Sequence, residues 1–292
     1  MSFLSYLISG ISLGSVYALI ALGYTMVYGI AKMLNFAHGD VIMVGGFIVF
    51  SFVSSLGLPP LLSVLLAVVL CALLGVVIER IAYKPLRSAT SLAVLITAIG
   101  VSYFLQNLAL LIFGSSAKSF KSVVPIGEIR LGPELVVSGE TVVTIAVSLL
   151  IMIALTLFVN RTRTGKAMLA VSEDKGAAQL MGINVNKTIS ITFAIGSALA
   201  AVAGVLLCSA YPSLKPTTGA MPGIKAFTAA VFGGIGSIPG AMIGGILLGV
   251  IENLSKAYIS SQMSDGIVFS VLILVLLIKP TGLLGKKINK KV

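Results

Sequence analysis

Apolar runs separated by short polar interruptions dominate the sequence, and most approach twenty residues in length. A helix needs about 20 apolar residues to cross the ~30 Å hydrocarbon core of a membrane. Two interruptions are very short, "GLPP" at Gly57–Pro60 and "GSIPG" at Gly236–Gly240. The pattern predicts nine crossing segments: Phe3–Tyr28, Val41–Leu56, Leu61–Tyr83, Leu92–Gly114, Val142–Val159, Ile189–Tyr211, Gly219–Gly234, Gly240–Asn253 and Gly266–Lys279.

The composition agrees with an all-α integral membrane protein. Of the 292 residues, 58% are hydrophobic and only 10% are charged, with a mean hydropathy of +1.11. A soluble domain carries roughly 25% charged residues. The start has no basic region ahead of its apolar run, so we expect no signal peptide. Cys71 and Cys208 lie in apolar runs and are expected to be packing residues, since two cysteines make no disulfide framework.

The lysines and arginines predict the orientation. If the nine segments alternate and the amino terminus lies outside, fourteen basic residues fall inside and six outside. The positive-inside rule favours this arrangement, with a cytoplasmic carboxyl terminus. Merging the seventh and eighth segments would place either the basic carboxyl terminus or the 161–187 loop outside. The fourteen inner residues are Lys32, Arg80, Lys84, Arg87, Arg161, Arg163, Lys166, Lys175, Lys187, Lys279, Lys286, Lys287, Lys290 and Lys291.

Several function classes are disfavoured by the chemistry that the sequence carries. The net charge of +11 is scattered among short loops, which is a topology signal before it is a nucleic-acid signal. The sequence has no G-x-x-x-x-G-K-[ST] string, so we expect no nucleotide-binding loop in this chain. No His, Cys, Asp and Glu set has metal-ligand spacing, so we expect no metal and no cofactor. Catalysis by a histidine triad would have to use His38, the only histidine.

The two halves share a weak internal similarity. "LGSVYALIALGY" (Leu13–Tyr24) resembles "IGSALAAVAGVL" (Ile195–Leu206), and "HGDVIMVGG" (His38–Gly46) loosely resembles "PGAMIGG" (Pro239–Gly245). Segments one to four would then repeat as six to nine with inverted orientation, an arrangement that points to a transport pathway at the repeat interface. Small residues in packed helices also produce such patterns by chance. We expect one transmembrane domain, 1–292, with repeats at about 1–115 and 188–285, a connecting span at 142–160 and an inner loop at 160–187.

Polar residues gather in "KMLNFAHGDVIMVGG", between the first two segments. Gly29, Asn35 and Gly39 would break one long helix there, and Asp40 is placed to cap the second segment. Non-helical backbone at membrane depth persists only where protein or a water-filled cavity satisfies it. The stretch is therefore either a break that lines or gates a pathway or a plain turn at the inner surface. The candidate pathway or gate residues are Asn35, His38, Gly39, Asp40, Gly233, Gly234, Gly236 and Ser237.

The longest inner loop, Asn160–Lys187, has a helical and amphipathic pattern. We expect two short helices whose apolar positions gather on one face, and Gly182 followed by Ile183 fits a Schellman stop. Such an element suits docking to a cytosolic partner, or else it lies flat on lipid phosphates. The acidic Glu173 and Asp174 argue mildly against lipid. The apolar positions are Met168, Val171, Leu180 and Met181.

Six motifs together resemble the permeases of ATP-binding-cassette importers for branched-chain amino acids, and specifically the shorter of that family's two permeases. The likeness runs from the first segment to just short of the carboxyl terminus. The motifs are "LNFAHGD" (34–40), "IERIAYKPLR" (78–87), "LITAIGVSYFLQN" (95–107), "SEDKGAAQLMGINVNK" (172–187), "AAVFGGIGSIPGAMIGG" (229–245) and "KPTGLLG" (279–285).

The resemblance implies a multi-pass permease of the cell (inner) membrane with a type II importer-like fold and broken helices. It implies pairing with a second homologous permease, docking of two ATPase subunits, and delivery of leucine, isoleucine or valine by an extracytoplasmic binding protein. ATP hydrolysis would lie on the partners, so this chain is not expected to be an enzyme. The implied coupling residues are Glu173, Asp174, Gly176, Ala177, Gly182, Ile183 and Asn184.

Other functions remain as alternatives. Permeases for urea or short amides are very similar, and the binding protein mainly selects the substrate. An ATPase-independent channel or facilitator would leave the 161–187 loop without a purpose. A secondary transporter usually carries ionisable residues in mid-membrane, whereas here Glu79, Arg80 and Glu252 lie near the segment ends.

Overall fold

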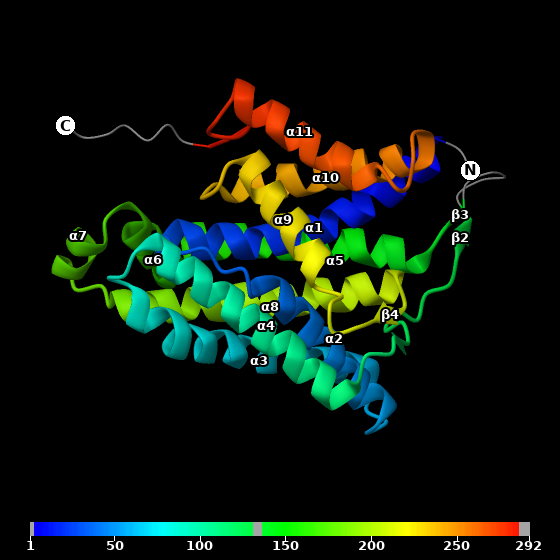
Figure 1. Ribbon diagram of the computed structural model, residues 1–292, viewed down its shortest axis with the longest axis horizontal. Coiled ribbons are helices and arrows are strands. Elements are labelled where there is room, and N and C mark those ends of the chain that lie inside the picture. Colours follow the sequence, from blue (N-terminus) through cyan, green and yellow to red (C-terminus); the bar gives the residue numbers. More distant parts are fainter. Residues whose placement is uncertain (1–2, 131–135, 286–292) are drawn as a thin grey trace.

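The computed structural model describes residues 3–130 and 136–285, and these form a bundle of helices that run side by side between two ends (Figure 1). Helices α6 and α7 lie at one end, here the α7 end, and the short strands lie at the other, here the strand end. The helices are α1 (Phe3–Ala31), α2 (His38–Ser54), α3 (Pro60–Ile78), the π-helix η1 (Glu79–Tyr83), the 3-10 turn η2 (Lys84–Leu86), α4 (Ser91–Phe113), α5 (Gly139–Arg161), α6 (Arg163–Glu173), α7 (Lys175–Leu180), α8 (Val185–Ala210), α9 (Ala220–Gly233), α10 (Ile238–Tyr258) and α11 (Ser264–Ile278).

Two small antiparallel pairs close the strand end. Strand β1 (Lys118–Ser119) pairs with β4 (Ser213–Leu214), and β2 (Ile129–Arg130) pairs with β3 (Val136–Val137). The first pair joins the chain that follows α4 to the chain that follows α8. These ladders pair part of the extended backbone in the connections.

The long helix α1 forms the centre of the bundle and packs on α10 and α8. Small residues bring α1 and α10 into backbone contact. A Cβ on Gly14 would lie 2.7 Å from the Ile246 Cα, and a Cβ on Gly10 would lie 2.9 Å from the Val250 Cα. In a membrane, where no hydrophobic effect drives helices together, such close packing supplies the attraction between them.

Two helices begin inside the bundle and not at an end. After α1 reaches the α7 end, residues 32–37 turn back and α2 begins beside Gly23 of α1 and Gly219. Likewise α8 ends near β4, and residues 211–219 lead inward to the start of α9, which lies against Gly39 of α2. The predicted break in the apolar pattern is therefore real.

The two halves of the chain share one order of elements: a long helix, an extended stretch and a shorter helix that starts in the interior. In this order α9 is the counterpart of α2. The stretch Pro239–Gly245, whose sequence resembles the start of α2, instead lies at the start of α10. That second match does not support the repeat, because it pairs elements at different places in the order. The repeat itself stays a prediction.

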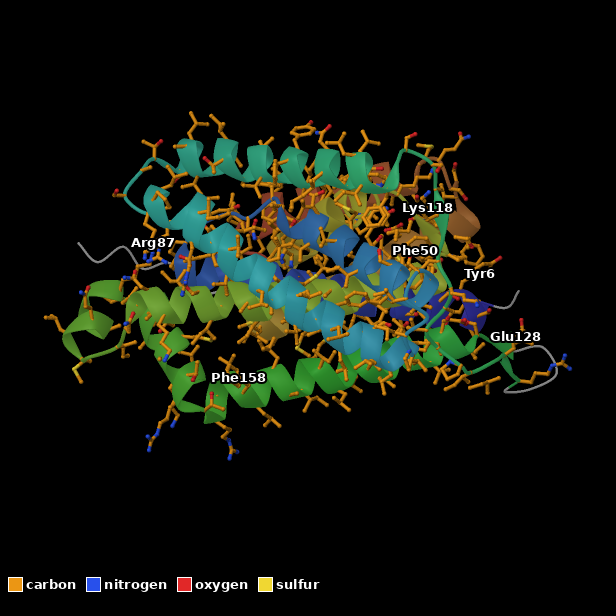
Figure 2. All side chains as sticks on the ribbon, turned by 90° about the horizontal axis from the view of Figure 1, so that it is seen from below. Tyr6, Phe50, Arg87, Lys118, Glu128 and Phe158 are labelled. Atoms are coloured by element: carbon orange, nitrogen blue, oxygen red, sulfur yellow. The ribbon has the colours of Figure 1, made fainter. Side chains whose placement is uncertain are left out.

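The outer helices expose apolar side chains, as expected for contact with lipid (Figure 2). Within the described residues, six helices are long and apolar enough to cross a membrane, and α2 and α11 are shorter apolar helices. With α9, these helices cover the nine predicted segments. The seventh differs, because α9 has 14 residues and at 1.5 Å per residue is only about 21 Å long. Of the basic residues used to predict the orientation, Lys225, counted as outer, lies within α9. Four of the inner residues lie outside the described part of the chain: Lys286, Lys287, Lys290 and Lys291.

Candidate functional site

The starts of α2 and α9 meet at three glycines in the interior. A Cβ on Gly39 would lie 2.7 Å from the Gly219 carbonyl oxygen, and a Cβ on Gly223 would lie 2.8 Å from the Gly39 Cα. The two backbones touch with no room for a side chain between them. Gly39 is therefore required for close approach and not for the helix break, because it lies within the first turn of α2.

His38 starts α2 and is 1% exposed. Its ring packs edge-on against Tyr24 of α1, with 4.7 Å between the ring centroids, and its Nε2 faces Gly23, where a Cβ would collide with it. Within the part of the chain that the structure describes, this Nε2 has no hydrogen-bond partner. The imidazole is thus wedged between α1 and the junction.

Asp40 is also buried, and its carboxylate joins α2 to α4. The Asp40 Oδ1 accepts a hydrogen bond from Gln106 Nε2 at 2.8 Å, and the same amide lies 3.3 Å from Ser102 Oγ. The predicted cap is wrong: Ala37 occupies the N-cap position of α2 without a side-chain hydrogen bond. Asp40 lies three residues after this cap, in the first turn of α2. Its negative charge there interacts favourably with the helix dipole, and its carboxylate accepts a hydrogen bond from α4.

The re-entrant segment 32–37 is held by a contact to the π-helix. Tyr83 Oη donates to Asn35 Oδ1 at 2.9 Å, and both residues are buried. Helix α1 runs through Gly29 to Ala31, so that glycine does not break it; the chain turns at Lys32, whose φ is 59°. The alternative of an inner-surface turn is wrong for this stretch, because Asn35, His38 and Asp40 are each 3% exposed or less.

The second predicted group, Gly233, Gly234, Gly236 and Ser237, lies elsewhere. It forms the turn from α9 to α10 at the far end of α9 from the junction, with φ of 108° at Gly234 and 90° at Gly236. Ser237 caps α10 by accepting from Gly240 N at 3.2 Å. The structure therefore brings the first four candidates together and keeps these four apart from them.

Helices α6 and α7 form the predicted amphipathic element, and each of its turns is capped. Asp174 Oδ1 accepts from Ala177 N at 2.9 Å at the start of α7. Gly182 has φ 80°, with Ile183 N bonded to the Ala178 carbonyl and Gly182 N bonded to the Gln179 carbonyl, the two bonds of a Schellman stop. Asn184 then caps α8 through Lys187 N at 3.0 Å.

The apolar residues of this element do not share one face. Met168 and Val171 of α6 are buried, and α6 packs against α1 and α8. Leu180 and Met181, by contrast, are 90% and 82% exposed at the end of α7. That part of the prediction is wrong, because the turn at Asp174 redirects the chain between the two helices. The result is a rigid element that carries an exposed apolar tip beside Gly176 and Ala177.

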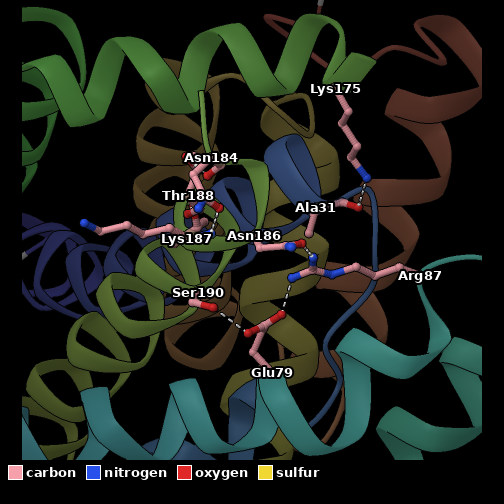
Figure 3. A network of polar contacts seen from close by, with 10 residues as sticks. Ala31, Glu79, Arg87, Lys175, Asn184, Asn186, Lys187, Thr188 and Ser190 are labelled. Atoms are coloured by element: carbon pink, nitrogen blue, oxygen red, sulfur yellow. Dashed lines mark hydrogen bonds and ion pairs between the residues drawn. The ribbon is translucent and has the colours of Figure 1, made fainter. Parts of the chain in front are cut away.

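A polar network at the α7 end ties together η1, the start of α8 and the short link between η2 and α4 (Figure 3). The buried Glu79 pairs with Arg87 and accepts from Ser190 Oγ at 2.6 Å, and Arg87 also donates to Asn186 Oδ1. Nearby, Lys175 Nζ donates to the Ala31 carbonyl at 2.9 Å. Burial lowers the pKa of Lys175, and the neighbouring positive charges of Arg87 and Lys32 lower it further.

A second buried network joins α1, α9, α10 and α11. Lys225 Nζ lies 2.8 Å from Glu252 Oε1 and 2.6 Å from Asp265 Oδ1. Glu252 also accepts from Tyr17 Oη at 2.8 Å and pairs with Lys256. Every charge in the group has an opposite partner, which is the condition for burying it.

Comparison with known proteins identifies the family. The family model described as "Branched-chain amino acid transport system / permease component" matches residues 6–277. The chain belongs to this family. Two relatives cover 99% of this permease and 98% of their own length: the high-affinity branched-chain amino acid transport system permease proteins BraD of Pseudomonas aeruginosa, 46% identical, and LivH of Salmonella typhimurium, 47% identical.

More distant proteins share the fold. The probable branched-chain amino acid transport permease protein LivH of Methanocaldococcus jannaschii is 32% identical over 91% of this chain and 88% of its own. A solved chain of PsaBC from Streptococcus pneumoniae, in complex with Fab, aligns with a TM-score of 0.50 over 95% of this chain and 92% of that one, at 16% identity. The protein is therefore a multi-pass membrane permease of this transport family, as the resemblance of its motifs indicated.

Sequence reasoning missed several residues that build the site of this permease. Gly219 and Gly223 complete the junction, Gln106 holds Asp40, and Tyr83 holds Asn35. Two signals were present in the sequence: Gln106 is one of two adjacent amides, with Asn107, in a largely apolar helix, and Gly219 and Gly223 are spaced by one helical turn. Neither signal indicates which residue is the contact partner, because the residues in contact are at least 48 positions apart along the chain.

Proposed function

We propose that this chain is the translocating permease subunit of an ATP-driven importer for leucine, isoleucine and valine. The observation that carries the proposal is the relationship to high-affinity branched-chain amino acid permeases, at 46–47% identity over 99% of the chain. Identity at this level over the whole length supports a shared substrate class as well as a shared fold.

The ATP chemistry belongs to partner subunits in this proposal. Two ATPase subunits dock on α6 and α7, whose tip exposes Leu180 and Met181 on a capped and rigid support. A short helix with apolar anchors suits insertion into a groove of a partner protein. The proposed coupling residues lie along α7 and at its two ends: Glu173, Asp174, Gly176, Ala177, Gly182, Ile183 and Asn184. A second homologous permease and an extracytoplasmic binding protein complete the importer.

The junction of α2 and α9 is the proposed gate. Polar groups within the bundle persist there because protein groups satisfy them, as for Asp40 with Gln106 and Asn35 with Tyr83. Tilting of α2 against α9 would open or close the interior beside His38. The residues act through position in this account, and not through proton transfer.

The α7 end faces the cytoplasm and the strand end faces outward in this proposal, as the fourteen-to-six distribution of basic residues favours. Cysteines placed at Met181 and Lys215 test it with a membrane-impermeant maleimide. We expect labelling of intact cells at Lys215 only, and labelling of both positions after permeabilisation. Labelling of Met181 in intact cells would reverse the orientation.

The substrate is tested by uptake in cells deleted for this chain and complemented with it. We expect complementation to restore uptake of labelled leucine at micromolar concentration and to leave labelled urea uptake unchanged. Restored urea uptake without leucine uptake would assign the chain to the amide branch. Leucine uptake that continues when the cassette ATPases are inactivated would instead indicate a facilitator.

A further inference from the structure

Helix α7 is attached to the bundle at its first residue. Lys175 Nζ donates to the carbonyl of Ala31, the last residue of α1 (Figure 3). The next residue, Lys32, takes a φ of 59° and opens segment 32–37. A cation at a helix C-terminus donates to a carbonyl that lacks a partner within the helix, and its charge interacts favourably with the negative end of the helix dipole. The start of α7 is thus fixed to the point at which the re-entrant segment begins.

The chain that leaves α7 is attached at a second point. Asn186 lies four residues after Gly182 in the first turn of α8, and its Oδ1 accepts from Arg87. Arg87 pairs with the buried Glu79, which also binds Ser190 of α8. The Schellman stop and the Asn184 cap connect the end of α7 to the start of α8 by hydrogen bonds, so this attachment acts close to the end of α7.

Both attachments lead to the same segment. Glu79 is the first residue of η1, and Tyr83, the last residue of η1, donates to Asn35 within segment 32–37. Segment 32–37 is therefore joined to the start of α7 through Ala31 and to the end of α7 through η1. Three residues beyond Asn35, His38 begins the half-helix at the junction.

We propose that Lys175 and Asn186 are positioning residues that transmit the movement of α7 to segment 32–37 and so to the junction of α2 and α9. This rests on the proposed function, in which α7 is moved by docked ATPases. One attachment alone holds α7 only in part, because the helix can pivot about it, whereas two fix both its position and its direction.

The test uses the complete importer in inside-out and right-side-out membrane vesicles, with leucine moved per ATP hydrolysed as the readout. We expect Lys175→Met to lower this ratio by about three- to tenfold, since it removes a part-buried hydrogen bond from a charged group, and Asn186→Ala to lower it by less, since the Asn186–Arg87 bond is exposed. ATP hydrolysis itself should persist, because the exposed tip that meets the ATPase is unchanged.

Matched controls remove the same charge from the same part of the molecule. Lys166 and Lys187 are exposed, and neither ammonium makes a hydrogen bond within the described residues; Lys187 points away from the network in Figure 3. Lys166→Met and Lys187→Met should keep the wild-type ratio. Lys175→Arg should recover most of the loss, because a guanidinium can still donate to the Ala31 carbonyl.

The double variant Lys175→Met/Asn186→Ala separates transmission from simple loss of packing. It should lose more than the product of the two single losses, because each attachment partly holds α7 when the other is missing. The ratio is counted per ATP, so a lower amount of variant in the membrane does not change it.

The outcomes distinguish this inference from the function on which it rests. Wild-type vesicles that hydrolyse ATP without moving leucine would overturn the proposed function. Active wild-type vesicles in which Lys175→Met matches Lys166→Met would overturn the positioning role alone. So would independent losses in the double variant, or a Lys175→Arg variant as uncoupled as Lys175→Met.

Discussion

Two extended stretches make the same kind of connection in different surroundings: 32–37 after α1 is largely buried, and 211–219 after α8 is partly exposed. Each leads from the end of a long helix to a shorter helix that begins in the interior. In the first stretch Met33, Asn35 and Ala37 are buried. In the second, Tyr211 to Ser213 are exposed and the backbone continues into the β1–β4 pair.

The difference shows how each environment satisfies an extended backbone. The interior stretch depends on side chains from other helices, such as Tyr83 on Asn35, because no water is available to replace them. The surface stretch uses strand pairing and a local bond from Lys215 N to Thr218 Oγ1 at 2.7 Å. Substitutions in the first should therefore cost much more than substitutions in the second.

The largest effect is expected at the glycine contact where the two stretches end. Gly39→Val should abolish uptake and strongly reduce the amount of folded protein, because its side chain would collide with the Gly219 carbonyl and separate α2 from α9. Overpacking of this kind costs about 1–3 kcal/mol or more. Uptake and membrane level are measured together.

Gly100→Val provides the control, since a Cβ on Gly100 of α4 meets nothing within 4 Å. It should retain wild-type uptake. Equal tolerance of both substitutions would show that the glycine contact is not required.

The next largest effect is expected at Asp40. Asp40→Leu removes the charged acceptor of the Gln106 amide, which keeps only the longer contact to Ser102 Oγ, at a cost of roughly 1.5–3 kcal/mol for a hydrogen bond to a charged group. Asp40→Asn keeps an acceptor oxygen and should retain much of the uptake. The measurement is thermal aggregation of purified protein in detergent, beside leucine uptake.

Adding Gln106→Leu to Asp40→Leu should recover part of the lost stability, because both partners of the pair are then apolar. A double variant less stable than Asp40→Leu would mean that Gln106 has a more important partner than Asp40.

A smaller effect is expected for Tyr83→Phe, which removes only the hydroxyl that holds Asn35. The loss should be about 1 kcal/mol of stability with a fall in uptake. Tyr28→Phe on α1 is the matched control, because Tyr28 makes no side-chain hydrogen bond within the described residues. If both variants behave alike, the Asn35 contact does not hold segment 32–37.

The smallest effect is expected in the surface stretch. Thr218→Ala removes the acceptor for Lys215 N, an exposed bond that water can replace, so the cost should be about 0.5 kcal/mol with uptake unchanged. A loss of uptake as large as that of Tyr83→Phe would remove the contrast between the two stretches.

The sequence predicted the features that depend on neighbours along the chain. The apolar runs located the helices, and Gly182 with Ile183 correctly marked the Schellman stop. It did not locate the partners of buried polar groups. The sequence placed Glu79 at the end of a span but gave it no partner. In the structure it is completely buried and accepts a hydrogen bond from Ser190, 111 residues away. Periodicity carries no information about such contacts, because they depend on how helices cross.

The error at Asp40 has the same physical origin. Asp is a favoured N-cap residue, and the position ahead of an apolar run was a reasonable place for one. The helix instead begins at His38, so Asp40 lies inside the first turn and meets α4. His38 is buried against Gly23 of α1, a contact between two helices that the sequence pattern does not show.

The burial of Lys225 has a consequence for biogenesis. This lysine precedes both of its carboxylate partners, Glu252 and Asp265, in the order of synthesis. A lysine costs roughly 2.5–3.5 kcal/mol at the centre of a membrane helix and less toward an end, so α9 is expected to insert less readily while Lys225 lacks these partners. We therefore expect α9 to reach its full stability in the membrane only after α10 and the start of α11 have been made. The charge on Lys225 links the insertion of α9 to that of the two helices that follow it.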